Sequence, residues 1–455
     1  MIVSNRGPIA FRLDQSGTPV ASKTGGGLAS ALRPLLDGEA LWIAASMSGA
    51  DMTAMQSGVT HGQGVHFVDV PADVYDNAYN RIANESLWFA HHGLLSAGAG
   101  DDSRWATAWP DFERYNQAMA NAVIAHAPQD AAVLVQDYHL CLMAPFVTAE
   151  RADLRLVHFS HTPWAAPDEL NIADTAADAV LRGMAAHHSC GFHSRRWADA
   201  YTRSSAAAGI AAAPIFVSAL GPDLDAARSI AAGAECNDEL LQLDAFAAGR
   251  SLVVRVDRIE PSKNILKGFA AFERVLESEP ALRKQLAFAA YVYPSRETIE
   301  TYRRLKHEIE SVCARINNRF GSDGDVPIWL DTTDNLPGAV AGMRRADALL
   351  VNPIRDGLNL VSMEGPMVNE HEARLILSTE AGAHDRLRDH CLSIDPTDVT
   401  ATATAIIEAV TMDRSHATQL ARGLRKEIGK RTPEQWRTDQ LDQAERSSRQ
   451  ELDHT

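Results

Sequence analysis

Basic side chains follow short apolar segments at two places in this chain of 455 residues. Arg6 comes shortly after the segment 1–3, and Arg258 and Lys263 follow the segment 252–256. Guanidinium and ammonium groups bind phosphates through charge-assisted hydrogen bonds, and a helix N-terminus adds its own N–H groups. The spacing of Arg258 and Lys263 across a strand-to-helix turn therefore predicts a diphosphate site, and Arg6 predicts a second site for an anion.

Each of these features also has a plainer interpretation. Arg258 and Lys263 would fit a pair of surface cations bridged to Asp257 and Glu260. The run Gly25-Gly26-Gly27 lets the backbone approach a ligand, but it would also fit an ordinary glycine-rich loop. We favour the phosphate-binding interpretation for the two cations because they stand where a strand ends.

Polar residues follow two further apolar segments. Asp137 follows the segment 132–135, and His161 follows the segment 156–159. A carboxylate or a neutral imidazole at such a place can bind sugar hydroxyls or move a proton. For Asp137 and the nearby His139, the alternatives are a capping aspartate and a core histidine. A metal site that includes His158 is weaker, because no third ligand has a suitable spacing.

The segment 351–364 is the most specific of the motifs and reads V-N-P-I-R-D-G-L-N-L-V-S-M-E. Asp356-Gly357 predicts the start of a helix whose N–H groups face a ligand. A phosphate would bind at that helix end, while Asp356 would bind sugar hydroxyls and Glu364 would accept hydrogen bonds from a ribose. The alternatives are a plain N-cap for Asp356 and a solvated helix face for Glu364.

Apolar strands that alternate with amphipathic or alanine-rich helices must position these residues. This order predicts an α/β protein with largely parallel sheets. The segment 223–250 interrupts the order and is interpreted as the connection between two domains, and a charged helix is expected after Pro433. The expected strands are 1–3, 41–45, 132–135, 156–159, 252–256, 286–292, 327–330 and 348–351, and the expected helices include 28–36, 112–126, 261–278, 296–318 and 335–345.

The composition argues against several classes of protein, including nucleic-acid-binding, membrane-spanning and disulfide-bonded proteins. The net charge of −16 argues against a nucleic-acid partner, since binding there depends on neutralising phosphates. No apolar stretch is long enough to span a membrane, and the first residues do not resemble a secretory signal. The five cysteines form no C-x-x-C pair, which argues against disulfides and zinc and favours the cytoplasm. The sequence leaves open whether the chain forms a homo-oligomer.

Taken together, these motifs resemble the retaining glycosyltransferases of the trehalose-6-phosphate synthase family. The resemblance runs in the family's order from Ser4 to about Asp395. Any one match is unspecific, but the ordered set is hard to obtain by chance. Further matches are Tyr79-Asn80, Asn84 with Leu87-Trp88 and His91, Gly191-Phe192, Pro294-Ser295-Arg296 and Arg315-Ile316-Asn317.

The resemblance implies a GT-B fold, in which two Rossmann-like domains face a cleft. It places an acceptor-binding domain at 1–235, a nucleotide-sugar domain at 250–430, and at 431–450 a helix that crosses back to the first domain. By the same resemblance, the acceptor side would comprise Arg6, Tyr79, Trp88, Asp137 and Arg296. The donor side would comprise Gly26, Gly27, Arg258, Lys263, Asp356, Gly357, Leu358, Asn359, Leu360 and Glu364, with His161 also holding the transferred glucose.

The implied reaction moves glucose from UDP- or GDP-glucose to glucose 6-phosphate, with retention of configuration and without an enzymic nucleophile. Neither a metal ion nor another cofactor is expected, because Arg258 and Lys263 would replace a divalent cation. The first alternative is a pseudo-glycosyltransferase or a synthase that uses another phosphorylated acceptor, either a cyclitol phosphate or glycerol phosphate. The last alternative is a non-catalytic sugar-phosphate sensor. The family's common R-L-D-Y-S-K-G reads R-I-E-P-S-K-N at 258–264, and its A-K-E reads S-M-E at 362–364, which leaves the nucleotide base and the acceptor open.

Overall fold

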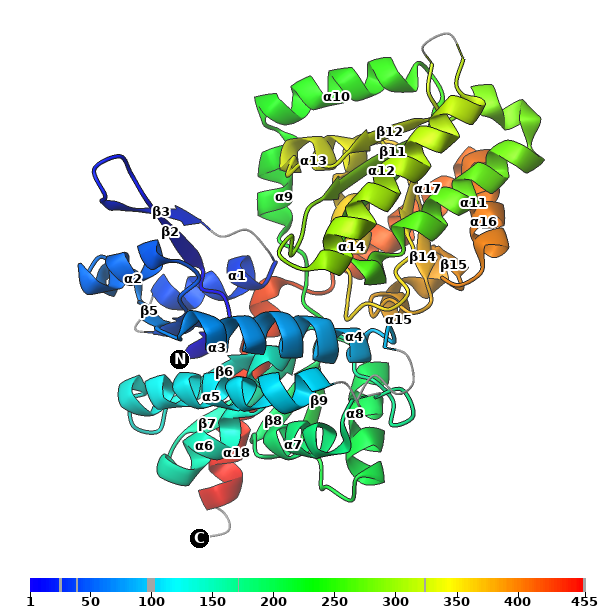
Figure 1. The fold of residues 1–455 in the computed structure, drawn as a ribbon. Coiled ribbons are helices and arrows are strands. Elements are labelled where there is room, and N and C mark those ends of the chain that lie inside the picture. The colour runs from blue at the N-terminus through cyan, green and yellow to red at the C-terminus, as the bar shows by residue number, and fades with distance from the viewer. Residues whose placement is uncertain (24–26, 38–39, 96–102, 171, 323–324, 453–455) are drawn as a thin grey trace. The chain divides into compact units, whose positions relative to one another are not determined.

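The structure, a computed structural model, describes residues 1–23, 27–37, 40–95, 103–170, 172–322 and 325–452. The chain divides into two compact units, and each is built around its own parallel β-sheet (Figure 1). The first unit comprises Met1–Leu220 with Pro433–Thr455, and the second comprises Gly221–Thr432. The predicted α/β class with parallel sheets is therefore confirmed.

The sheet of the first unit has seven parallel strands. Its central strands are buried on both faces, as their nearly continuous apolar sequences require. In spatial order the strands are β5 (Val65–Val68), β4 (Trp42–Ala45), β1 (Ile2–Ser4), β6 (Ala132–Gln136), β7 (Arg155–Ser160), β8 (Ser189–Phe192) and β9 (Ile215–Val217). A separate antiparallel hairpin is formed by β2 (Ile9–Leu13) and β3 (Pro19–Lys23).

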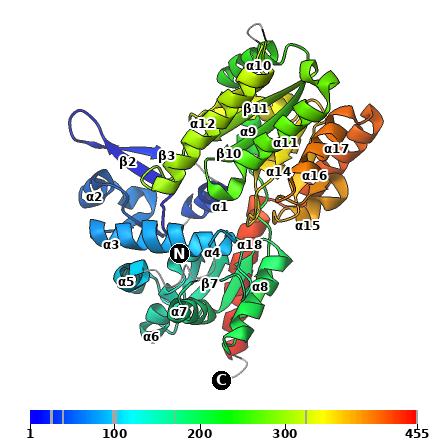
Figure 2. The same ribbon diagram turned by 45° about the vertical axis from the view of Figure 1, so that its right-hand side comes forward.

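Helices from both ends of the first unit's sequence cover its sheet. The last helix, α18 (Pro433–Leu452), packs on β6, β7 and β8 and buries Trp436 against Phe159 (Figure 2). The remaining helices are α1 (Gly27–Leu32), η1 (Arg33–Asp37), α2 (Gly49–Gln56), η2 (His61–Gln63), α3 (Ala72–Asp76), η3 (Asn77–Leu87), α4 (Trp88–His91), α5 (Ser103–His126), η5 (Tyr138–Leu140), α6 (Met143–Glu150), α7 (Asp174–Ala185) and α8 (Arg195–Ala207).

The sheet of the second unit has six parallel strands. In spatial order they are β12 (Ile328–Asp331), β11 (Leu286–Tyr293), β10 (Ser251–Arg258), β13 (Ala348–Val351), β14 (Arg374–Ser378) and β15 (Leu392–Ile394). The helices are α9 (Leu224–Ala231), α10 (Ala234–Ala247), η6 (Pro261–Lys263), α11 (Ile265–Ser278), η7 (Pro280–Lys284), α12 (Glu300–Phe320), α13 (Leu336–Arg345), α14 (Val361–Val368), α15 (His384–Leu387), η8 (Arg388–His390), α16 (Val399–Thr411) and α17 (Arg414–Ile428).

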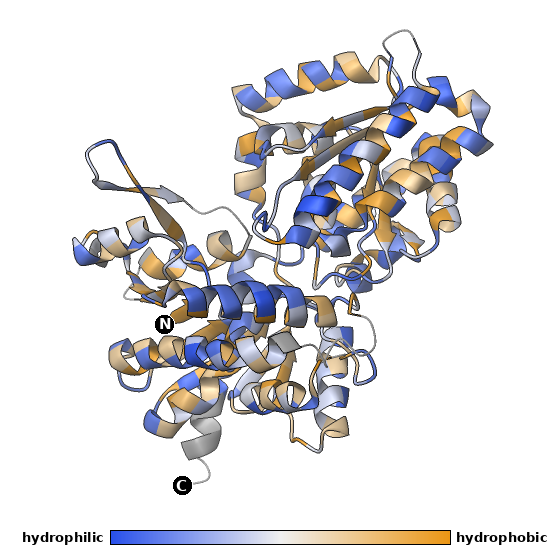
Figure 3. Ribbon diagram, viewed as in Figure 1, coloured by the Kyte–Doolittle hydropathy of each residue, from blue (hydrophilic) through white to orange (hydrophobic). Residues whose placement is uncertain are grey.

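Amphipathic helices enclose this second sheet. Apolar residues of α11, α12 and α16 form one core cluster with the strands, while α13 packs on β10 and β11. Figure 3 shows hydrophilic and hydrophobic residues side by side on the helices of this unit, and α11 buries its apolar residues on one face. Among the described residues, no helix combines the length and the apolar character that a membrane span needs.

The eight predicted strands are all confirmed, and no end differs by more than two residues. The predicted boundary at residue 235 differs from the division that the contacts show, which lies between Leu220 and Gly221. Most of the segment 223–250 forms α9 and α10, which pack against α13 in the second unit. Apolar residues of that segment, including Ala227 and Leu243, are buried there, so a segment expected to connect two domains is part of one.

Close packing of α7 yields a prediction. A Cβ atom on Gly183 would lie 2.2 Å from the backbone oxygen of Cys141, whereas one on Gly49 would meet nothing within 4 Å. We expect Gly183→Ala to destabilise the protein by about 1–3 kcal/mol, because the backbone of a neighbouring segment must move. Gly49→Ala, also in a helix of the first unit, is the matched control. Urea unfolding measures both variants, and equal stability of the two would contradict this packing.

Candidate active site

Both sheets reverse their strand order at one place. The reversal lies between β1 and β6 in the first unit and between β10 and β13 in the second. Ligands of open parallel sheets bind beyond the carboxyl ends of the strands that flank such a reversal. Arg6 and Asp137 follow β1 and β6, and Lys263 and Asp356 follow β10 and β13. Each unit therefore has predicted functional residues at its switch point.

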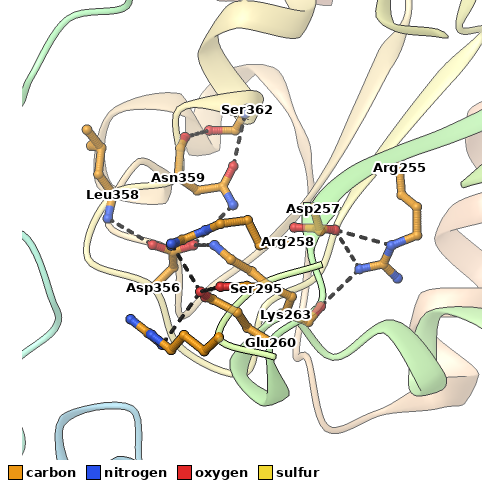
Figure 4. Close-up of polar contacts among 11 residues, drawn as sticks. Arg255, Asp257, Arg258, Glu260, Lys263, Ser295, Asp356, Leu358, Asn359 and Ser362 are labelled. Atoms are coloured by element: carbon orange, nitrogen blue, oxygen red, sulfur yellow. Dashed lines mark hydrogen bonds and ion pairs between the residues drawn. The ribbon is translucent and has the colours of Figure 1, made fainter. Parts of the chain in front are cut away.

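Lys263 and Asp356 form an ion pair across the switch point of the second unit (Figure 4). The Lys263 Nζ atom lies 2.6 Å from Asp356 Oδ2, and both side chains are largely buried. Burial lowers the pKa of Lys263, but neighbouring carboxylates, first among them Asp356, outweigh that effect and leave the pKa raised. The lysine is therefore charged, and a phosphate would meet it as a desolvated cation.

The loop 356–360 is held by side chains and by a backbone bridge between Asp356 and Ala381 rather than by a helix. The helix α14 begins at Val361, so the prediction that Asp356-Gly357 opens a helix is wrong. Asn359 has a φ of 78° and donates from Nδ2 to Asp356 Oδ2 at 3.1 Å, while its Oδ1 accepts a hydrogen bond from the Ser362 N–H. Asp356 is thus no N-cap: Leu360 directly precedes the helix, and the Asn359 side chain accepts the hydrogen bond from its first turn.

Two backbone donors remain available in this loop. Within the ranges that the structure describes, the N–H groups of Asn359 and Leu360 have no acceptor. Gly357 and Leu358 are buried, and the Leu358 N–H lies 3.4 Å from Asp356 Oδ1. Together with Lys263, these donors make the end of the sheet suitable for an oxyanion.

Arg258 and Arg296 contact the same carboxylate. Glu260, which is 1% exposed, lies 3.1 Å from Arg258 Nη1 and 3.6 Å from Arg296 Nη1. Its charge raises the pKa of Arg258. Arg296 was predicted on the acceptor side with residues of the first unit, but it lies in the second unit. The expected bridge from Arg258 to Glu260 is present, whereas Asp257 has another partner.

A buried ion pair supports the turn that carries Lys263. The Arg255 guanidinium lies 2.7 Å from Asp257 Oδ2 and donates to the backbone oxygens of Lys263 and Ile265. Burial raises the pKa of Asp257, and the Arg255 charge opposes that rise. A Cβ atom on Gly268 would lie 2.4 Å from Arg255 Nη1, so glycine makes room for the guanidinium.

Glu364 lies in the first turn of α14, where it is largely buried. Burial, and then the charge of Asp223, raises the pKa of Glu364 to about 7. A solvated helix face, the alternative interpretation, would leave that pKa at its ordinary value. Burial removes water from the carboxyl group. A hydroxyl of a bound ligand would form the hydrogen bonds that this water no longer makes.

In the first unit, Arg6 and Tyr79 contact each other. Arg6 Nη2 lies 3.3 Å from the Tyr79 hydroxyl, and the Tyr79 ring stacks between Tyr75 and His139. Tyr79 belongs to η3, a π-helix, a form that often occurs at functional sites. Trp88 is only 3% exposed and stacks on a histidine, so it forms part of the surrounding wall rather than an open surface.

Asp137 and His161 lie together at the end of β6 and β7. Asp137 has a φ of 73°, and its Oδ1 accepts a hydrogen bond from the His161 backbone N–H at 3.1 Å. Such a backbone conformation is costly for a residue with a side chain and is frequent at functional sites. The two residues predicted to meet a sugar are therefore brought together.

Both ring nitrogens of His161 have protein partners. The Leu220 N–H donates to His193 Nδ1, so His193 Nε2 carries a proton and donates to His161 Nδ1 at 3.1 Å. His161 Nε2 then donates to Gln136 Oε1, and Gln136 Nε2 donates to Gln440 Oε1. Burial and the neighbouring His193 hold the pKa of His161 well below its ordinary value. The imidazole is thus neutral and has one tautomer.

The glycine-rich loop is only partly described. Gly26 lies outside the described residues, and Gly27 is the first residue of α1. In the described part of the chain, no group of three or more His, Cys, Asp and Glu side chains could hold a metal ion. His158 is fully buried and lies 3.2 Å from Ser160 Oγ, which fits a core residue.

Sequence reasoning missed the residues that hold the predicted ones in place. Arg255 and Asp257 are two apart in a strand and so share one face, which was a usable signal for a buried pair. No local signal pointed to partners from distant segments. The missed residues are Gln136, His193, Arg255, Tyr302 and Gln440, and Glu260 was considered only as a surface partner.

The raised pKa of Glu364 predicts how stability depends on pH. Between about pH 4.5, the unfolded pKa, and about 7, the folded state binds more protons than the unfolded state, so stability falls as pH rises. Glu364→Gln removes this penalty, and we expect it to stabilise the protein at pH 8 by on the order of 2 kcal/mol, with no gain at pH 4.5. Urea unfolding across this range measures the effect.

The control for that variant is Glu273→Gln. Contacts with Arg315, and then Arg319, lower the pKa of Glu273, so its stabilising contribution is present at neutral pH and lost in acid. Its removal is expected to have the opposite sign at pH 8. A constant effect of Glu364→Gln at every pH would contradict the assignment.

The hydrogen-bond chain to Gln440 predicts a spectroscopic effect. Gln440→Leu removes the acceptor that orients the Gln136 amide, so the hydrogen bond from His161 Nε2 to Gln136 Oε1 should weaken, while His193 keeps the tautomer of His161. Nitrogen NMR of labelled histidine measures this as a shift of the His161 Nε2 signal. The exposed Thr438→Leu on the same helix is the control and should leave the signal unchanged. An unshifted His161 Nε2 signal in Gln440→Leu would contradict the hydrogen-bond chain from His161 through Gln136 to Gln440.

Comparison with known proteins identifies the family. A model of glycosyltransferase family 20 matches residues 1–446. A bifunctional trehalose-6-phosphate synthase/phosphatase of Thermoproteus tenax is 27% identical over 96% of this chain and 62% of its own length. The validamine 7-phosphate valienyltransferase of Streptomyces hygroscopicus subsp. jinggangensis is 28% identical over 81% of this chain and 76% of its own.

A solved structure shares the whole architecture. It is an alpha,alpha-trehalose-phosphate synthase (UDP-forming) from Burkholderia xenovorans in complex with glucose-6-phosphate. Its TM-score is 0.82 at 23% identity, over 98% of this chain and 99% of that one. This chain spans less than two thirds of the length of several curated relatives. Since the family model covers nearly all of its residues, the chain belongs to glycosyltransferase family 20, and it has the GT-B fold of that structural neighbour.

Proposed function

We propose that the chain is a retaining hexosyltransferase that moves glucose from UDP- or GDP-glucose to glucose 6-phosphate and so forms trehalose 6-phosphate. The observation that carries this proposal is the set of donors at the end of the second sheet. Arg258, Lys263 and the N–H groups of Asn359 and Leu360 suit a diphosphate that leaves with negative charge. The names of the Thermoproteus and Burkholderia proteins support the choice of substrates.

The donor would rearrange the ion pair of the second unit. We expect Lys263 to turn from Asp356 to the diphosphate, which leaves the Asp356 carboxylate to accept hydrogen bonds from hydroxyls of the glucose. Glu364, when ionised, would accept hydrogen bonds from the ribose. Because its pKa lies near neutrality, donor affinity should weaken in acid.

The acceptor would use a different set of residues. Arg6 and Tyr79 would bind the phosphate of glucose 6-phosphate, with Arg296 as the further cation of the predicted set. Asp137 would accept a hydrogen bond from the acceptor sugar. His161 would donate from Nε2 to a hydroxyl of the transferred glucose, in exchange for Gln136.

The chemistry then needs positioning and charge stabilisation rather than a side-chain nucleophile. The acceptor oxygen would attack from the face on which the nucleoside diphosphate leaves, which retains the configuration. Arg258 and Lys263 would take the role that a divalent cation has elsewhere, so we propose that turnover needs no metal and survives a chelator. The five free thiols suit a reducing compartment such as the cytoplasm.

A second candidate is transfer to a different phosphorylated acceptor. The observation in its favour is the similarity to a validamine 7-phosphate valienyltransferase, which is 28% identical over 81% of this chain, against 27% over 96% for the Thermoproteus protein. The changes at Pro261 and Asn264, beside the donor cations, fall where such a difference would act.

An activity grid tests the proposal. Pure protein is incubated with UDP-glucose or GDP-glucose and with glucose 6-phosphate, glycerol phosphate or a cyclitol phosphate. We expect nucleoside diphosphate release with one donor when glucose 6-phosphate is present, and Lys263→Ala should lower kcat by about 10²–10³-fold. Lys267→Ala, on the next turn of α11, is the control. Activity only with another acceptor selects the second candidate, and release with neither donor refutes glucosyl transfer.

A further inference from the structure

A single buried carboxylate joins two arginines that come from neighbouring strands. Arg258 is the last residue of β10 and lies in register with Tyr293, the last residue of β11. Arg296 follows β11 by three residues. Glu260 contacts both guanidinium groups through Oε1, which also accepts a hydrogen bond from Ser295 Oγ at 3.2 Å (Figure 4).

The two arginines differ in how firmly they are held. The Arg296 side chain is 10% exposed, its Nη1 lies 2.6 Å from the Tyr302 hydroxyl, and its guanidinium lies over the Tyr302 ring. Its φ of 49° is costly for a residue other than glycine and requires support from its surroundings. The Arg258 side chain is 44% exposed, so its contact with Glu260 is the strongest constraint on it that the distances show.

The charge of Glu260 acts on both arginines in two opposite ways. It attracts each guanidinium and so keeps it in one place before a ligand arrives. It also competes with an incoming anion, since the three groups together carry a net charge of +1 instead of +2. Glu260 therefore lowers the affinity of the cluster for a free anion while it fixes where that anion binds.

We propose that Glu260 is a positioning residue that holds Arg258 and Arg296 in one arrangement, so that the donor diphosphate and the acceptor phosphate are placed through the same carboxylate. The inference rests on the proposed function, in which these two arginines serve the two substrates. In this proposal Glu260 acts on both substrates through the two arginines, so it is a positioning residue and not a binding residue.

The test separates kcat from anion affinity. Glu260→Gln keeps the shape and one acceptor oxygen but removes the charge. We expect kcat to fall by about 100-fold, the scale of a small misplacement of a reacting group. The Kd for inorganic pyrophosphate, measured by calorimetry, should stay within threefold or become tighter, because a competing charge is lost. A collapsed site would instead lose both activity and affinity.

Two variants complete the design. Glu260→Asp keeps the charge on a shorter side chain, and aspartate is the residue that the family's common motif has at this position. We expect its kcat to be at least tenfold higher than that of Glu260→Gln. Glu273→Gln is the matched control, since Glu273 also joins two arginines, Arg315 and Arg319, but lies on α11 away from the strand ends. It should leave both kcat and the pyrophosphate Kd unchanged.

Either of two results overturns the proposal: a kcat of Glu260→Gln within threefold of the parent, or pyrophosphate binding weakened more than threefold. Pyrophosphate binding needs no turnover, so it tests the positioning role of Glu260 even if no pair of donor and acceptor reacts. In that case the proposed function fails on the activity grid, while affinity that is kept or increased in Glu260→Gln still supports the arrangement of the two arginines.

Discussion

The reversal of strand order between β10 and β13 is the constraint on which the site of the second unit depends. It brings the turn after β10 and the loop after β13 together at one edge, so Lys263 and Asp356 meet although they are 93 residues apart. Burying this pair costs solvation, and only good geometry offsets that cost. Two contacts support this geometry. Asn359 donates a hydrogen bond to the Asp356 carboxylate, and Arg255, which is paired with Asp257, donates one to the backbone oxygen of Lys263.

In the first unit, the site residue His161 is held by neutral partners instead of by an ion pair. His161 is partly buried and lies beside His193, so an imidazolium would be costly, and the neutral ring makes a hydrogen bond at each nitrogen. The last partner in that chain, Gln440, comes from the final helix. The end of the sequence thus contributes to the same hydrogen-bond chain as the strand ends β6 and β7.

The features that could be predicted from the sequence were those that depend on residues close together in the chain. Continuous apolar strands identified both sheets, and cations after strand ends identified Arg258 and Lys263 as site residues. Partners from distant segments, such as Gln440 for Gln136, leave no local pattern. The segment 223–250 was misjudged because its alanine-rich, acidic composition resembles a linker, although α9 and α10 pack on α13 and bury Ala227, Leu243 and Ala247.

The departures from the family motif after β10 are compensated within the same turn. Asn264 stands where the common motif has glycine, and it has a φ of 58°, a conformation that asparagine tolerates better than most residues. Its Nδ2 donates to the backbone oxygens of Asn352 and Pro396, which ties the left-handed turn to the segments after β13 and β15. Pro261 begins η6, where a missing N–H costs little. The backbone that presents Lys263 is therefore kept without the family's glycine, so these substitutions change the lining of the site and not the position of its cation.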